Sequence, residues 1–284
     1  MTHSSFTRSL GFGMLALALA ACSGDRATGP GDTVSDAEIE MGIAADAGDA
    51  VATSVDLMVQ DEGAAGASAR LTPAAGVSAD VLTSATTATC GGPDADGWYS
   101  CDRTTWRGLD LERQIRFWEG DATAPAWDPA ATDSVNTRVT LAGTFHPAAE
   151  PSKTVWVNRA DTATMLVDRS GTTVLHVWNR VGVREDSASY VRALVTRDFH
   201  YTAHDTAAAV AFAMPRSEHP WPQSGTVVHA ITTLFTATGG ARDLTRTVTR
   251  RVQVTFNGTE TVPIQVGELT CELDLGTHEV SGCR

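Results

Sequence analysis

Recognisable catalytic motifs are missing from this sequence of 284 residues. It contains no Gly-x-Ser-x-Gly, no phosphate-binding P-loop, no His-Glu-x-x-His and no dinucleotide-binding glycine fingerprint. Lysine is almost absent, with Lys153 alone, and the formal net charge is −13. An acidic chain of this kind lacks the positive surface with which proteins bind nucleic acids or anionic lipid headgroups. We therefore expect no catalytic activity, no cofactor, no metal and no nucleic-acid partner.

Long apolar runs are also missing, apart from one near the N-terminus. Residues 10–21 form this run, and Arg8 precedes it. A helix of this length is too short to cross about 30 Å of hydrocarbon, which indicates a processing signal rather than a membrane span. We therefore expect residues 1–21 to be a signal peptide that takes no part in the fold.

The end of this run, Leu19-Ala20-Ala21-Cys22, resembles the lipobox of bacterial lipoproteins. The resemblance implies cleavage before Cys22 and acylation of this cysteine, so that the membrane is a partner through the lipidated residue. Several acyl chains on one residue give a stable hold without a spanning segment. Ser23, where some lipoproteins carry an inner-membrane Asp signal, implies the outer membrane. The alternative is an ordinary secretory signal followed by an incidental cysteine.

Four further cysteines form two pairs that are local in the sequence. Cys90 lies near Cys101, and Cys271 lies near Cys283. In an oxidising compartment we expect each pair to form a disulfide, although three connectivities exist. A four-cysteine zinc site is the alternative, but neither pair has the two-to-four-residue spacing of such sites. The hairpin between Cys271 and Cys283 should turn near Gly276-Thr277.

The composition divides the exported chain into three parts. Residues 22–33 are small, polar and rich in Gly and Pro, which is typical of a flexible tether. Residues 34–88 are acidic and rich in Ala, and Ser35-Asp-Ala-Glu38 resembles a helical capping box. We expect one or two helices up to about residue 61 and a linker after them; a disordered extension is the alternative. Residues 89–284 form a β domain.

Alternating apolar and polar residues recur through the β domain, as expected for half-buried strands. The alternating segments are 135–145, 153–167, 172–183, 189–203, 225–238, 246–256 and 261–275. Turn signals separate them at 169–171, 184–187, 215–222, 239–240 and 257–258. Asn257-Gly258 is the strongest of these hairpin signals. The pattern predicts a mainly β protein, with an antiparallel meander of about ten strands.

The two faces of the strand at residues 172–183 differ in character. Val181 and Val183 lie on the face predicted to pack into a core, together with Leu175 and Val177. The other face carries His176, Trp178 and Arg180, which predicts contact with water or with a covering layer. We expect the sheet to curl into a partial barrel with a short N-terminal helix against it. A two-sheet sandwich is the alternative.

Candidate ligand-contacting residues are few. The stiff segment His219-Pro-Trp221-Pro222 could contact a ligand or close the end of the sheet. His200 and His204 would stand about 13 Å apart on one strand, too far to share a metal ion.

These observations leave three functions, of which an enzyme is the least favoured, because it would need a cleft in which His, Asp or Glu residues from separate strands converge. The first is a non-catalytic, lipid-anchored envelope protein whose core is filled by its own side chains. The second is a carrier of a lipid or another hydrophobic ligand, which requires an apolar concavity. In outline, the lipidated cysteine, early helix and long meander are similar to the carrier and receptor lipoproteins of the outer-membrane lipoprotein pathway.

Overall fold

One helix and thirteen strands make up the part of the chain that the computed structural model describes, residues 36–68, 90–146, 151–192, 194–240 and 243–284. Helix α1 spans Asp36–Ser68. The strands are β1 (Cys90–Pro93), β2 (Tyr99–Trp106), β3 (Leu109–Glu119), β4 (Ala122–Ala124), β5 (Ser134–Phe145), β6 (Thr154–Asp168), β7 (Leu175–Arg192), β8 (Val195–Ala213), β9 (Ser224–Thr238), β10 (Leu244–Thr255), β11 (Thr261–Val266), β12 (Leu269–Asp274) and β13 (Val280–Ser281). The predicted signal peptide, Cys22 and the tether lie outside the described residues.

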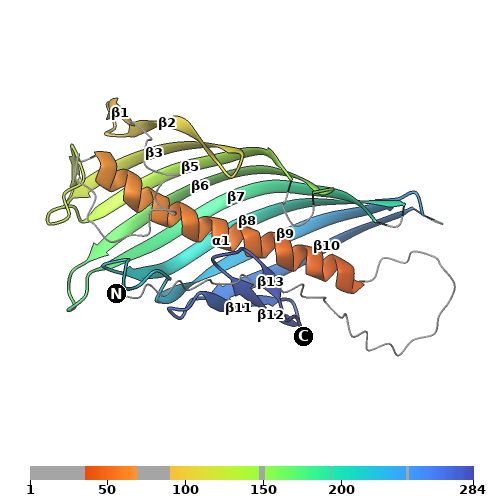
Figure 1. Ribbon diagram of the computed structural model, residues 1–284. Coiled ribbons are helices and arrows are strands. Elements are labelled where there is room, and N and C mark those ends of the chain that lie inside the picture. The colour runs from red at the N-terminus through yellow and green to blue at the C-terminus, as the bar shows by residue number, and fades with distance from the viewer. Residues whose placement is uncertain (1–35, 69–89, 147–150, 193, 241–242) are drawn as a thin grey trace, which may run out of the picture. The chain divides into compact units, whose positions relative to one another are not determined.

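The strands form a single antiparallel sheet in which neighbours along the chain are neighbours in the sheet (Figure 1). Only β4 leaves this order, because it pairs with the end of β3 on the side opposite β5. The predicted mainly β fold and meander are therefore confirmed, as one open sheet rather than a sandwich. There are more strands than predicted partly because segment 261–275 is not one strand. It turns at Gly267, where φ is +57°, and so forms β11 and β12.

Helix α1 covers one face of the sheet, which we call the inner face, and runs obliquely across the strands (Figure 1). Its many alanines favour a helix, and Asp36 and Glu38 in the first turn suit the positive end of the helix dipole. Its side chains are buried on several sides, including Ile39, Ile43 and Val51. The helix is longer than the short segment predicted. No described helix has the length and apolar character needed to cross a membrane.

Two glycines let helix α1 approach the sheet closely. A Cβ atom at Gly42 would lie 2.7 Å from the Phe199 ring, and one at Gly48 would lie 2.3 Å from a Val280 methyl group. Contacts this short do not occur between real carbon atoms, so any other residue at these positions would push the helix outward. The helix therefore needs glycine at both points of contact.

The main core lies between helix α1 and the inner face. Large inner-face side chains such as Met165, Trp178 and Phe235 are fully buried there against apolar helix residues. A second, smaller core surrounds Leu57 near the end of the described part of the helix, among residues of β2, β3, β5 and β6. The helix thus takes the volume that an apolar ligand would otherwise fill.

The prediction of which face of β7 is buried was wrong. Val181 and Val183 are 59% and 51% exposed, whereas Trp178 and Arg180 are buried beneath the helix. The alternation itself is correct, because successive residues do point to opposite faces. The charged face is the covered one because the helix brings acidic groups to it, as described below.

The predicted turn at residues 184–187 was wrong for the same reason. Strand β7 continues through this segment, pairing Arg184 with Arg159 of β6 and with Ala203 of β8. Charged residues are typical of turns, but Arg184 and Asp186 are buried and ion-paired within the sheet. The other predicted turns do separate strands.

Both expected disulfides are present. Cys90 is bonded to Cys101, its direct neighbour across the β1–β2 pair. Cys271 is bonded to Cys283, and the intervening hairpin turns at residues 275–277, as predicted. Each disulfide closes a short loop and, by the chain-entropy model, contributes on the order of 3 kcal/mol of stability.

Two neighbouring residues of β6 test the assignment of faces. Met165 is 1% exposed on the inner face, and Leu166 is 47% exposed on the outer face. Met165→Ala should lower the free energy of unfolding by about 2–5 kcal/mol, since it leaves a cavity. Leu166→Ala should change it by no more than about 0.5 kcal/mol. Denaturant titration measures both, and equal losses would contradict the assignment.

Candidate functional site

Every carboxylate of helix α1 from Asp36 to Glu62 meets a cationic or histidine side chain of the β domain. The helix has no basic residue of its own in this range. The pairs are Asp36–Arg246, Glu38–Arg197, Glu40–Arg250, Asp46–Arg184, Asp49–Arg159, Asp49–Arg107, Asp49–His278, Asp56–His278, Asp61–Arg113 and Glu62–His176. We call this set the helix clamp.

Arg184 is the centre of the helix clamp and is completely buried. Its Nη1 lies 2.5 Å from Asp46 Oδ2 of the helix and 3.0 Å from Asp186 Oδ2 of its own strand. Asp186 also accepts a 2.7 Å hydrogen bond from Arg159 Nη2, and that guanidinium lies 3.3 Å from Asp49. Buried ions need such partners, because each carries a desolvation penalty. Two arginines and three aspartates thus form one network across the interface.

Burial and ion pairing shift the pKa values of the helix carboxylates in opposite directions. Burial raises the pKa of Asp46 to about 6, although Arg184 opposes the shift. Burial also raises the pKa of Asp61, against the opposing effect of Arg113. Burial alone would raise the pKa of Asp49, but His278, Arg159 and Arg107 together hold it below its usual value. With a pKa of about 6, Asp46 therefore becomes protonated at mildly acidic pH.

A buried aspartate–histidine pair adjoins the helix clamp. His229 Nδ1 is hydrogen-bonded to Asp205, whose other oxygen lies 3.3 Å from Arg184 Nε. His229 Nε2 has no hydrogen-bond partner among the described residues. Burial lowers the pKa of His229, although Asp205 opposes this, so the neutral imidazole is favoured. Through Arg184, the pair extends the charged network of the helix clamp.

The opposite face of the sheet, the outer face, is hollowed. An open trough of about 940 Å³ lies over strands β2, β3 and β5–β8. Depressions of about 510 Å³ and 450 Å³ adjoin it, because they share lining residues with it. We call these three together the outer trough. Its outward-facing lining includes Arg138, Thr140, Thr162, Val181, Val183, His204 and Thr206.

Two arginines and two tryptophans stand at one end of the outer trough. The guanidinium carbons of Arg116 and Arg138 lie 4.4 Å and 4.0 Å from the centre of the Trp98 ring. Arg116 also lies 4.7 Å from the Trp118 ring. These are cation–π distances, at which an aromatic ring attracts and orients a cation.

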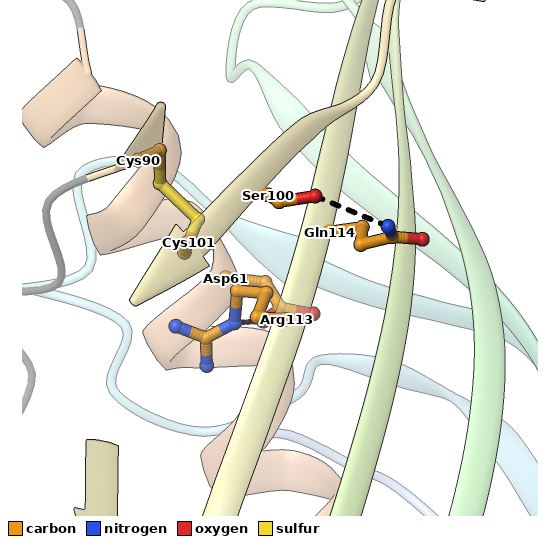
Figure 2. The surroundings of a disulfide bond; sticks show 6 residues. All are labelled: Asp61, Cys90, Ser100, Cys101, Arg113 and Gln114. Carbon is orange, nitrogen blue, oxygen red and sulfur yellow. Dashed lines mark hydrogen bonds and ion pairs between the residues drawn. A yellow bond between two sulfur atoms is a disulfide. The ribbon is translucent and has the colours of Figure 1, made fainter. Parts of the chain in front are cut away.

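Figure 2 shows the surroundings of the Cys90–Cys101 disulfide, where residues of the helix clamp and residues that line the trough lie on the same strands. The Cys90–Cys101 disulfide lies beside the ion pair between Asp61 of helix α1 and Arg113 of β3. Gln114 donates a 3.2 Å hydrogen bond to Ser100 on the neighbouring strand, and both line the trough. Arg113 and Gln114 are adjacent and point to opposite faces, so one strand serves both sites.

The ligand-contact candidates from the sequence do not meet at either site. Trp221 packs against the main core, and neither it nor His219 lines the outer trough. His200 lies 3.4 Å from Glu185 on the outer face, and His204 lines the trough. No group of three potential metal ligands occurs among the residues that the structure describes.

Sequence reasoning missed both the helix clamp and the trough. The clamp had a visible signal, since an acidic helix without basic residues precedes strands that carry buried arginines. The trough had none, because its lining comes from strands far apart in the sequence.

Comparisons with protein-family models, with curated proteins and with solved structures found no match for this chain.

The buried and exposed ion pairs provide a test of the helix clamp. Arg184→Met should lower the free energy of unfolding by about 3–5 kcal/mol, because Asp46, Asp186 and Asp205 lose their shared cation in a buried site. Arg103→Met removes an exposed cation from Glu112 and Asp110 and should leave the unfolding midpoint almost unchanged. Urea titration compares them, and a small effect of Arg184→Met would refute the structural importance of the clamp.

Proposed function

We propose that this chain is a lipid-anchored protein of the bacterial cell envelope that acts by binding or by structural support, not by catalysis. The lipobox resemblance at Leu19–Cys22 supports the anchor, and two disulfides are typical of an exported protein. Acylation at Cys22 would hold the protein at the outer membrane, facing the periplasm or the cell surface. The β domain would then sit beyond a tether of residues 22–33.

The filled inner face is the observation that supports a role other than carrying a hydrophobic ligand. Helix α1 packs apolar side chains such as Ile43 and Met58 against the sheet, and its carboxylates pair with the inner-face cations. A carrier would need this volume for its ligand. With the inner face occupied, the outer trough offers a large concave surface to a partner.

Labelling with radioactive palmitate in a bacterial host tests the anchor. The full-length chain should incorporate label and remain with the membrane fraction, because acyl chains contribute about 0.8 kcal/mol for each buried methylene group. The Cys22→Ser chain should incorporate none. Equal labelling of the two chains, or none in either, would overturn the proposed anchoring at Cys22.

A carrier function is the second candidate, and the helix clamp gives it a specific basis. The clamp attaches helix α1 to the sheet largely through ion pairs, and the inner face beneath it is lined by Trp178, Phe199 and Phe235. If the helix swung away, it would uncover an apolar surface suited to an acyl chain. The raised pKa of Asp46 makes one of these attachments sensitive to protonation.

A variant in which a disulfide fixes helix α1 to the sheet distinguishes the non-carrier function from the carrier function. The paired change G48C/V280C also replaces the Val280 side chain, whose methyl group is what a Cβ atom at Gly48 would otherwise meet, and the two Cβ atoms would lie 3.9 Å apart, within the usual disulfide range. Native mass spectrometry of residues 23–284 should show an apo mass short by four hydrogens, for the two native disulfides. The carrier function would be established instead if the wild-type protein retained a lipid, the G48C/V280C chain did not, and reduction of the new disulfide restored the binding. Wild-type protein treated with the same reductant is the control.

A further inference from the structure

Two cations at the outer trough, Arg116 and Arg138, have no carboxylate partner in the part of the chain that the structure describes. Arg138 makes no ion pair or hydrogen bond with the described residues, and Arg116 donates only a 3.4 Å hydrogen bond to the Asp96 carbonyl. The nearby acid Glu112 is paired with Arg103. Both guanidinium groups lie over the same Trp98 ring, so the two positive charges stand close together. Together they provide a local positive site that matches an anionic ligand.

Trp98 and Trp118 hold these cations in place before any ligand arrives. Trp98 is 6% exposed, and both guanidinium groups lie over its ring. Trp118 Nε1 donates a 2.5 Å hydrogen bond to Asn136, which donates in turn to Thr164 across the sheet. Arg116 Nε is buried without a hydrogen-bond partner among the described residues. Fixed guanidinium planes favour ligands with planar carboxylates.

The lining of the trough favours a ligand rich in hydroxyl groups. Side chains with hydroxyl or amide groups border Arg138, including its cross-strand neighbours Gln114 and Thr162. Val181 and Val183 add a small exposed apolar floor. Sugar rings present both hydroxyl groups and apolar C–H faces. The volume of about 940 Å³ in the main trough is large enough for an oligosaccharide.

Other ligand classes fit this surface less well. An acyl chain needs a continuous apolar bed, and here polar side chains interrupt the two valines. A nucleic acid needs a broad basic surface, which the net charge of −13 opposes.

We propose that the outer trough binds an acidic, carboxylate-bearing oligosaccharide, with Arg138 and Arg116 pairing with its carboxylates. This inference rests on the proposed envelope function and names the class of ligand.

Calorimetric titration of residues 23–284 with a galacturonate tetramer tests the site. The tetramer should bind, and Arg138→Gln should weaken its affinity about tenfold or more, the scale expected for a lost charge-assisted hydrogen bond. Arg251→Gln is the matched control, since Arg251 is an exposed arginine of β10 that does not line the trough. That change should alter the affinity less than about twofold.

Several outcomes would overturn the proposal. Absence of binding, equal binding of the neutral cellotetraose, or an equal affinity of the Arg138→Gln chain would each reject an acidic-sugar site at this place. Inorganic phosphate that competes at the same concentration would point to a phosphate group instead, whether free or on a lipid headgroup. None of these results affects palmitate labelling of Cys22, so the two proposals fail separately.

Discussion

Charge pairing between helix α1 and the sheet is the constraint on which the rest of the structure depends. The helix is acidic throughout, and the face it covers carries arginines that would be costly to bury without partners. Neither surface is suited to water alone, because large apolar side chains such as Trp178 and Phe235 lie between the charges. Together they satisfy both the apolar and the ionic requirements, which fixes the position of the helix.

The same pairing determines how the wide sheet is accommodated. A sheet of thirteen strands has to curl, split or be covered. Here a long helix covers the inner face, and Gly42 and Gly48 allow the close approach that this packing requires. The two disulfides lie at opposite ends of the strand order, where few neighbours hold the short terminal strands. Side chains stabilise the centre, and covalent bonds secure the edges.

Because helix α1 covers the inner face, a partner can bind more readily to the outer face. The inner face has the apolar residues expected of a carrier, but helix α1 occupies it. The outer face is open and polar, and it carries the oriented pair Arg116 and Arg138. Both proposed functions therefore depend on whether the helix stays in place. A fixed helix leaves the outer trough as the functional surface, whereas a mobile helix would add the inner one.

Local patterns in the sequence were sufficient to predict the long strands of the meander, most of the turns and both disulfides, but not the separate strands β1–β4. Alternation has a period of two whatever the tertiary contacts, and cysteines close in sequence pair readily across a hairpin. The pattern could not decide which face of β7 is buried, because alternation is the same for either orientation. Only the tertiary structure decided this, by placing Asp46 of the helix against Arg184. It alone also assembled the outer trough, since the neighbours of Arg138 come from strands whose spacing in the sequence carries no signal.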